Sequence, residues 1–365
     1  MTLKIAILYP QLTHFGGAER VVLSIARNFD TIIFTGTFDP LHTHPDFQNF
    51  RIKTYQHFLG RIPVLKTYHA ALSSFLLNLE KFDVINPHIF PNTFVSLRFG
   101  SRTVWYCHAP LRPAHDDKAF LTLKNLKPVK KFVNLVYGNL QEALDTIAMR
   151  RVAKILTNSH VSEKRIAKFY NRKATVVYPG INPKLFRRED FGDFLLYVGG
   201  LSRTNAEPHK RPELAINAMR LMRDKQLYVV GEGKQKKILE ASAPSNVKFL
   251  GNIPEEELRD LYARCMAVLY PSYNEEFGFV PIEGMASGKP VIACIDGGGV
   301  RETIVDKETG FLVEPTPKGI AEAVRKLEDR SLLLKMSENA MQRSLLFSED
   351  KFVEGIKQNF ELLAR

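Results

Sequence analysis

The segment Tyr273–Pro290, YNEEFGFVPIEGMASGKP, organises the rest of the chain. It follows the apolar run Ala267–Tyr270, which is typical of a short buried strand that ends in a loop. Apolar residues along one face then predict a helix, and a Gly-Lys-Pro sequence ends it. Strand character resumes at Val291–Cys294. A helix therefore begins at the carboxyl end of a strand, with Phe277–Phe279 at its start.

Such a helix start is suited to an anion. It presents free backbone N–H groups and the positive end of the helix dipole, and Gly278 lets a ligand approach the backbone. Glu275 precedes the turn and Glu283 lies eight residues further on. Amides for a phosphate with a carboxylate on each side fit a nucleotide-sugar, one carboxylate for sugar hydroxyls and the other for the ribose. The alternative is a solvated helix start with two ordinary acidic residues.

This arrangement resembles the signature of the retaining glycosyltransferases of family 4, which have the GT-B fold. Their motif is a Glu, seven residues and a second Glu, with Phe-Gly between them. It stands here as Glu275, Phe277, Gly278 and Glu283. The resemblance implies that Phe277, Gly278, Phe279 and Glu283 bind the donor.

Length and composition are those of a two-domain globular protein. The chain has 365 residues, of which 45% are hydrophobic and 25% charged. The start, MTLKIAILYP, predicts a first buried strand rather than a signal peptide, and no apolar run is long enough to span a membrane. The three cysteines lie far apart in apolar runs and predict buried free thiols of a reducing compartment. No cysteine or histidine spacing predicts a metal site.

Charge is distributed unevenly along the chain. Residues 1–185 contain 25 Lys and Arg against 11 Asp and Glu, whereas the remainder contains 26 against 28. A basic half joined to a near-neutral half predicts that the first half meets an anionic surface. Anionic lipid, a phosphorylated acceptor and nucleic acid are the candidates.

A double glycine follows the first predicted strand. Gly16 and Gly17 lie in a strand-to-helix turn, where a backbone can approach a phosphate or sugar. The sequence is not GxGxxG, so the dinucleotide fingerprint is absent, and a plain loop is the alternative. Gly-Gly followed by Ala-Glu-Arg is similar to the opening of many family 4 mannosyltransferases. The resemblance makes Gly16 and Gly17 donor-binding residues and Glu19 a candidate on the acceptor side.

His108 follows the predicted strand Arg102–Cys107. Ligands of open α/β sheets bind at the carboxyl ends of strands, and a histidine there donates or accepts a hydrogen bond at neutral pH. The alternative is a histidine that only caps the strand. The run YCHAPLR resembles the YCHTP-type run of family 4, in which this histidine faces the donor sugar. Arg112 and Asp116 follow in the same loop as acceptor-side candidates.

The next segment mixes basic and apolar residues. Lys118, Lys124, Lys127, Lys130 and Lys131 are interleaved with Phe, Leu and Val, and Pro128 interrupts the run. This mixture suits the headgroup level of a bilayer, and a solvated helix packed on its own domain is the equal alternative. Aromatic residues are too sparse for single-stranded nucleic acid, and no nucleic-acid-binding motif is present.

The second domain begins beyond the Pro- and Gly-containing linker PGINPKLF, with its boundary near residue 186. Lys210 lies at the start of the helix that follows its first strand, where a cation and helix amides form an anion site. Family 4 enzymes have an Arg directly after this strand's Gly and a Lys ahead of the helix, and both bind the diphosphate. Lys210 matches, whereas Gly200 occupies the Arg position. Arg203, in the same loop, is the candidate substitute.

The remaining motifs also resemble the family in order. Asn252 and Ile253 match a loop whose backbone contacts the nucleotide base, and Asp296–Gly299 match a Gly-Gly loop. Strands and helices alternate in both halves, which predicts an α/β protein of two doubly wound, Rossmann-like parallel sheets. The resemblance implies a GT-B fold with a ligand cleft between the domains. The domains are residues 1–185 with the C-terminal helix, about 348–365, which crosses back, and residues 186–347.

These features predict a retaining, metal-independent glycosyltransferase. Lys210 and Arg203 with the amides near Gly278 are expected to stabilise the departing nucleoside diphosphate, in place of a metal ion. Glu275 is expected to hold sugar hydroxyls and Glu283 the ribose, while His108 faces the donor. The resemblance suggests front-face substitution, in which the leaving phosphate takes the acceptor's proton. Gly16 and Gly17 are expected to close on the donor from the first domain.

The donor and acceptor follow from the resemblance and the charge distribution. The GGAER and YCHAP runs look most like mannosyltransferases of glycan or lipid-linked oligosaccharide assembly, which implies GDP-mannose. A UDP-sugar is the main alternative. The basic half predicts a polyprenyl-linked or other glycan acceptor and a cytoplasmic, peripheral place on the inner membrane face. A nucleotide-sugar epimerase would have the same fold, and Gly200 is the feature that favours an inactive GT-B scaffold.

Overall fold

The computed structural model describes residues 3–55, 63–111, 128–202 and 210–364, with the backbone alone for 63–68 and 128–137. Contacts divide the chain into two compact units, Met1–Pro179 with Phe352–Arg365, and Gly180–Lys351. The domain boundaries predicted from the sequence lie near residues 186 and 348. The observed divisions therefore lie six residues earlier in the linker and a few residues later at the C-terminal helix.

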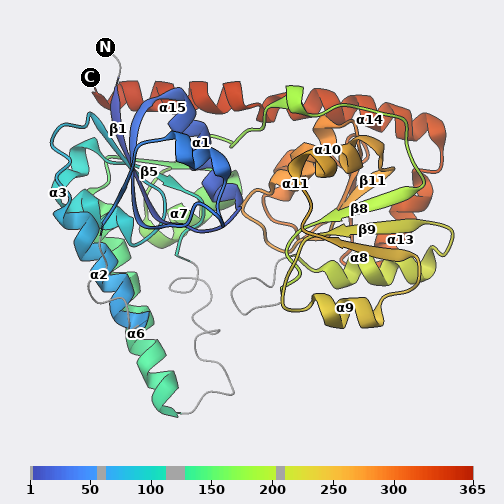
Figure 1. The fold of residues 1–365 in the computed structure, drawn as a ribbon, viewed down its shortest axis with the longest axis horizontal. Helices are drawn as coiled ribbons and strands as arrows, with labels where there is room; N and C mark the ends of the chain where they lie inside the picture. Colours follow the sequence, from blue (N-terminus) through green and yellow to red (C-terminus); the bar gives the residue numbers. More distant parts are fainter. Residues whose placement is uncertain (1–2, 56–62, 112–127, 203–209, 365) are drawn as a thin grey trace. The chain divides into compact units, whose positions relative to one another are not determined.

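The first unit is built on parallel strands flanked by helices (Figure 1). Its strands are β1 (Lys4–Leu12), β2 (Asp30–Phe38), β3 (Ile52–Thr54), β4 (Val84–Pro87), β5 (Val104–Cys107), β6 (Lys154–Thr157) and β7 (Thr175–Val176). They form a four-stranded sheet in the order β3-β2-β1-β4 and a three-stranded sheet in the order β5-β6-β7, and a parallel bridge between Ile85 and Thr103 connects the two. Its helices are α1 (Gly17–Asn28), α2 (Pro63–Leu76), α3 (Ser96–Phe99), α6 (Pro128–Arg151), α7 (His160–Tyr170) and most of α15 (Glu349–Ala364).

The second unit holds one six-stranded sheet of parallel strands in the order β10-β9-β8-β11-β12-β13. Its strands are β8 (Phe194–Val198), β9 (Gln226–Val230), β10 (Val247–Gly251), β11 (Ala267–Tyr270), β12 (Val291–Cys294) and β13 (Gly310–Val313). Its helices are α8 (Pro212–Ala218), α9 (Lys236–Ser242), α10 (Glu255–Arg264), α11 (Phe279–Ala286), α12 (Val300–Thr303), α13 (Pro317–Lys326) and α14 (Arg330–Ser344). In Figure 1, α8 and α13 cover one face of this sheet, and α10 and α11 cover the other.

Short 3-10 helices join these elements. They are η1 (Pro45–Asn49), η2 (Asn92–Val95), η3 (Gly100–Arg102), η4 (Pro183–Leu185), η5 (Met219–Leu221) and η6 (Leu345–Phe347). Helix starts follow local capping rules: Ser159, Thr316 and Asp329 each accept a backbone N–H of the helix that they precede. Helix α6 begins at Pro128, which is tolerated in a first turn because its missing N–H has no partner there anyway.

Each sheet is buried between its helices. In the second unit, apolar residues of β8 and β9 pack against α8 and α13, with Leu195, Tyr197 and Val324 at most 1% exposed. In the first unit, Trp105 lies among residues of α6 and α7. The strands read as nearly continuous apolar runs because both faces of a parallel sheet are covered. The three cysteines are buried and free, as predicted.

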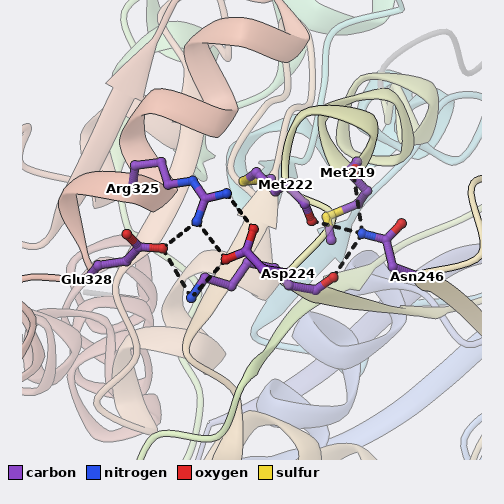
Figure 2. A network of polar contacts seen from close by, with 7 residues as sticks. Met219, Met222, Asp224, Asn246, Arg325 and Glu328 are labelled. Carbon is purple, nitrogen blue, oxygen red and sulfur yellow. Dashed lines mark hydrogen bonds and ion pairs between the residues drawn. The ribbon is translucent and has the colours of Figure 1, made fainter.

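Polar contacts fix the turn that leads into β9 (Figure 2). The side-chain amide of Asn246 donates to the carbonyls of Met219, Met222 and Lys225, at 3.2, 2.9 and 2.8 Å. Close by, Arg325 of α13 donates to Asp224 at 2.7 Å and to Glu328 at 2.6 Å. The guanidinium of Arg325 holds the pKa of Asp224 well below its usual range. This network lies at the amino ends of the strands, because β9 begins at Gln226.

The C-terminal helix α15 packs on the first unit from Phe352 onward. The Phe360 ring contacts Phe29 with centroids 5.7 Å apart, and the Phe352 ring meets Tyr106 at 5.8 Å. The chain therefore returns to the unit where it began, as the sequence analysis predicts for residues 348–365.

Candidate active site

The loops after β8 and β11 meet in the middle of the second sheet. In the order β10-β9-β8-β11-β12-β13, chain connections leave β8 and β11 in opposite directions. Open α/β sheets bind ligands at such a switch point, outside the carboxyl ends of the strands. Lys210 follows β8 and Glu275 follows β11, so topology brings two residues 65 positions apart to one place.

Three side chains form a triangle there. Lys210 Nζ lies 2.6 Å from Glu275 Oε2 and donates to the Tyr270 hydroxyl at 2.7 Å. The Tyr270 hydroxyl in turn donates to Glu275 Oε2 at 3.1 Å. The side chains of Lys210 and Glu275 are 30% and 15% exposed, so the pair is partly open to a ligand.

The charges of this triangle are fixed near neutral pH. Burial lowers the pKa of Lys210, but the adjacent Glu275 carboxylate and Tyr270 outweigh it, so the pKa is raised well above its ordinary value. Burial, followed by Glu275, raises the pKa of Tyr270 to about 12. Lys210 is therefore a cation and Tyr270 a neutral hydroxyl.

A second ion pair holds the surrounding loops. Arg211 adopts a left-handed conformation (φ 41°) at the start of α8, and its guanidinium donates to Asp296 at 2.7 Å. The backbone of Glu275 donates to Gly297 and accepts from Gly299, at 3.2 and 2.7 Å. The two loops are thus paired, and Glu275 has a fixed backbone.

The start of α11 requires a glycine. Gly278 has φ 89°, and a Cβ there would lie 3.2 Å from the Tyr270 ring. Phe277, 3% exposed, packs its ring against Phe279 and Phe347. The backbone amides that open α11 therefore begin beside the triangle, where helix dipole and cation both favour an anion.

The other predicted donor residues of the second unit differ in their surroundings. Glu283 is only 4% exposed and accepts from the Tyr262 hydroxyl at 2.9 Å. Asn252 and Ile253 follow β10, two strands from β8, at roughly 10 Å by strand spacing. Gly200 lies two residues beyond the end of β8, and a Cβ there would meet no heavy atom of the described residues within 4 Å.

The first unit carries a different cluster after β4 and β5. His88 and His108 follow these strands, and His88 Nδ1 lies 2.9 Å from His108 Nε2. The other nitrogen of His88, Nε2, lies 2.9 Å from Asn86 Oδ1. Burial lowers the pKa of His88 well below its ordinary value and that of His108 to about 3, so both rings are neutral.

The double glycine lies at the start of α1. Gly16 precedes the helix and Gly17 is its first residue. Glu19 is 7% exposed, and its carboxylate accepts hydrogen bonds from the Tyr9 hydroxyl and the backbone at Gly16. Burial raises the pKa of Glu19. The Glu19 carboxylate therefore stabilises the turn at Gly16. Contact between Glu19 and an acceptor stays a prediction.

Several predicted residues lie outside the described ranges. These are Arg203, Arg112, Asp116, Lys118, Lys124 and Lys127, while Lys130 and Lys131 have a described backbone only. No helix among the described residues is long and apolar enough to cross a membrane. Within the same ranges, no three His, Cys, Asp or Glu side chains are grouped so as to hold a metal ion.

Three of the residues that build these clusters, and one pairing between residues, were not predicted from the sequence. Tyr270 and Asn86 lie within strands, and the apolar pattern there predicted only that each strand is buried. His88 follows its strand just as His108 does, so the same position rule applies to it. The pairing of Arg211 with Asp296 had no local signal, because 85 positions separate the two.

The chain matches two protein families in succession. Residues 15–185 match Glycosyltransferase Family 4, and residues 192–343 match Glycosyl transferases group 1. Among curated relatives, the alpha-1,3/1,6-mannosyltransferase ALG2 of Mus musculus is 27% identical, over 97% of this chain and 95% of that protein. The O-antigen chain mannosyltransferase RfbU of Salmonella typhimurium is 28% identical over 47% of this chain and half of its own length.

Solved structures show the same fold. HepE of Anabaena, solved in complex with UDP and glucose, superposes with a TM-score of 0.75 at 18% identity, over 98% of this chain and 99% of that one. WaaG, from lipopolysaccharide biosynthesis, superposes with a TM-score of 0.73 at 17% identity, over 98% and 99%. With two family matches that span nearly all of the sequence, the chain belongs to the family 4 glycosyltransferases of the GT-B fold.

Proposed function

We propose that this glycosyltransferase transfers mannose from GDP-mannose to a glycan or polyprenyl-linked acceptor, with retention of anomeric configuration and no required metal ion. The triangle of Lys210, Tyr270 and Glu275 at the switch point of the second sheet carries the proposal. Mannose is favoured because relatives over most or half of the chain are named mannosyltransferases.

Lys210 is the group that meets the departing diphosphate. Lys210 donates to Tyr270, and the Tyr270 ring lies against Gly278 at the start of α11. The lysine cation and the positive end of the α11 dipole therefore both favour an anion at this place. Glu275 holds Lys210 in the free protein and is oriented by its backbone pairing with Gly297 and Gly299. When the diphosphate takes over the Lys210 contact, Glu275 becomes available to sugar hydroxyls.

The bond changes need no protein nucleophile. The bond from the anomeric carbon to the diphosphate oxygen breaks, and the bond to the acceptor oxygen forms on the same face. The acceptor's proton passes to the departing phosphate oxygen. The protein's part is to position both substrates and to stabilise the charge that develops on the diphosphate.

A thermal-shift panel with GDP, UDP, ADP, GDP-mannose and UDP-sugars, with EDTA or with Mg²⁺, tests the donor. A ligand that binds only the folded state raises its stability. We expect shifts with GDP and GDP-mannose that EDTA leaves unchanged, followed by transfer of mannose to a lipid-linked acceptor. A shift that requires Mg²⁺ would contradict metal independence.

A UDP-sugar donor is the second candidate. The observation in its favour is that HepE, which shares the fold, was solved with UDP and glucose. In the same panel, a shift with UDP and not with GDP would establish it and keep the mechanism. No shift with any nucleotide would favour an inactive scaffold, in which Gly200 leaves the diphosphate without its second cation.

We also propose a peripheral membrane contact for the first unit, on the cytoplasmic face. Residues 1–185 carry the excess of basic residues, and α6 begins with Lys130 and Lys131 in its first turn. Further along α6, Leu140 and Ile147 are 46% and 47% exposed. Basic residues with exposed apolar ones suit an anionic bilayer surface.

Charge reversal tests this contact. Replacing Lys127, Lys130 and Lys131 by Glu should reduce sedimentation with phosphatidylserine-containing vesicles, and the reduction should disappear with neutral vesicles.

The matched control reverses three exposed lysines elsewhere in the same unit, Lys164, Lys168 and Lys173. It changes the net charge equally. Equal loss in both triple variants would show a general charge effect and overturn the proposal of a defined membrane face.

A further inference from the structure

The side-chain amide of Asn86 has only one orientation that fits its surroundings. Its Nδ2 donates to the backbone carbonyl of Val104 at 2.6 Å, and a carbonyl oxygen can only accept. The opposite orientation would place two oxygens together. Asn86 Oδ1 is therefore the atom that faces His88 Nε2, at 2.9 Å, and Nε2 must carry the proton of that hydrogen bond.

The orientation of Asn86 sets the tautomer of His88. Because His88 is buried and neutral, a proton on Nε2 leaves a lone pair on Nδ1. That lone pair lies 2.9 Å from His108 Nε2, and the two ring planes are inclined by 25° with their centroids 5.1 Å apart. The centroid separation exceeds the N–N distance by about twice the radius of an imidazole ring, so the rings meet edge to edge rather than face to face. Lone pair and N–H both lie in the plane of an imidazole, so this geometry joins an acceptor to a donor.

His108 is the donor in this contact, so its Nε2 is protonated and its Nδ1 carries the lone pair. The backbone on both sides holds the geometry. Trp105 Nε1 donates to the His88 carbonyl at 3.0 Å, and Asn158 Nδ2 donates to the His108 carbonyl at 2.7 Å. His108 is partly exposed, and within the described ranges its Nδ1 makes no hydrogen bond that the structure records.

We propose that Asn86 and His88 are positioning residues that hold His108 as the Nε2–H tautomer, so that its Nδ1 accepts a hydrogen bond from a hydroxyl of the transferred sugar. The sugar as ligand rests on the proposed function, whereas the tautomer is a property of the free protein. A lone pair at this position favours a neutral hydroxyl and disfavours a carboxylate or phosphate oxygen.

The tautomer is tested first, in the free wild-type protein labelled with ¹⁵N-histidine. Long-range ¹H–¹⁵N correlation spectra distinguish the Nε2–H form, the Nδ1–H form and the imidazolium, and His108→Gln and His88→Asn assign the two residues. We expect the Nε2–H form for both rings from pH 7.5 to pH 5.5. An Nδ1–H form or an imidazolium at His108 would overturn the proposal, whatever the substrate is.

Two variants of His88 separate positioning from packing. His88→Asn places an amide near the former Nδ1 and retains an acceptor, whereas His88→Leu has similar bulk and no acceptor. We expect His108 to keep its tautomer in the Asn variant and to lose it in the Leu variant. Binding of GDP-mannose should weaken roughly three- to tenfold in the Leu variant alone, the range for one neutral hydrogen bond. Binding of GDP, which lacks the sugar, should not change.

An analogue series identifies the hydroxyl. Each mannose hydroxyl of GDP-mannose is replaced in turn by hydrogen, and binding is measured in the wild type and in His88→Leu. One deoxy analogue should bind the wild type more weakly than GDP-mannose does. The same analogue and GDP-mannose should bind His88→Leu equally well, because the contact is already absent in that variant. If the affinity of every analogue falls by the same factor in both proteins, His108 does not contact a sugar hydroxyl, even where the spectra confirm its tautomer. Absence of any nucleotide-sugar binding by the wild type would contradict the proposed function, and the spectra would still decide the tautomer.

Discussion

The two units share the order of their first six strands but differ in charge at the carboxyl ends of their central strands. In the second unit, a cation and a carboxylate lie 2.6 Å apart beside a helix start. In the first unit, two neutral imidazoles and an amide form a hydrogen-bonded row. The same edge of a parallel sheet therefore presents an ion pair in one unit and an uncharged hydrogen-bonded row in the other.

Net charge alone gives the opposite impression. The basic half, residues 1–185, holds the neutral row, and the near-neutral half holds the charged triangle. Most of the described Lys and Arg side chains of the first unit lie at its surface, where ions are solvated and cost little. Lys210 of the second unit is partly buried and held by Glu275, so its charge has a fixed position and is screened less by solvent. A few placed charges decide what a site binds.

The largest effect is expected at the charged triangle. Lys210→Met should lower kcat/KM about 100-fold and weaken GDP about tenfold, because a charge-assisted contact to the diphosphate is lost. Isothermal titration and initial rates measure the two. Lys225→Met is the matched control, since that lysine is 19% exposed and paired with Glu328 at the other end of the sheet. An equal loss of kcat/KM and of GDP affinity in Lys225→Met would show that the effect is not specific to the charged triangle.

The neutral row should make the first unit sensitive to acid. The pKa of His88 and of His108 lies below the unfolded value of about 6.5, so the unfolded chain binds more protons and stability falls as pH drops below 6.5. His88→Leu should reduce this slope by up to about 1.4 kcal/mol per pH unit.

Urea unfolding at pH 7, 6 and 5 measures this slope. The one tryptophan of the chain, Trp105, is buried in the first unit and reports on that unit alone. Tyr9 and Tyr106 also face His88, and their raised pKa values keep them neutral throughout this range. An unchanged slope in the variant would mean that His88 is not held neutral.

A smaller effect, and a gain, is expected from added charge at Gly200. No heavy atom of the described residues lies within 4 Å of a Cβ there, so Gly200→Arg should fold and strengthen GDP binding roughly three- to tenfold through a second cation. Gly200→Ala controls for the loss of glycine and should leave binding unchanged. Weaker binding by the Arg variant would show that the diphosphate does not pass this strand end.

The smallest effect is expected at the ion network of Figure 2. Arg325→Gln should shift the Tm by no more than about 2 °C, because surface ion pairs are solvated in either state. GDP affinity should not change. A clear loss of GDP binding would mean that charges far from the switch point contribute to it. Placement of charge at the strand ends would then not explain the difference between the two units.

Much of this arrangement could be predicted along the chain. The strands Ala267–Tyr270 and Val291–Cys294 have the predicted bounds, because buried parallel strands are short apolar runs with clear stops. Family motifs also predicted Lys210, Glu275 and His108 at strand ends. One strand edge was less accurate: the strand predicted at Arg102–Cys107 begins two residues later, at Val104. The ends of elements depend on hydrogen bonding and packing as well as on local pattern.

The sequence by itself determined which residues stand at the ends of strands and which are buried, since both follow from local periodicity and turn residues. Only the tertiary structure decided which strand ends are neighbours. Lys210 meets Glu275 because β8 lies beside β11, and His88 meets His108 because β4 lies beside β5. The physical reason is that strand order arises from crossover connections and packing of the whole sheet, which no local pattern specifies. The tautomer of His108 depends on the same neighbours, because Asn86 fixes it through a second ring.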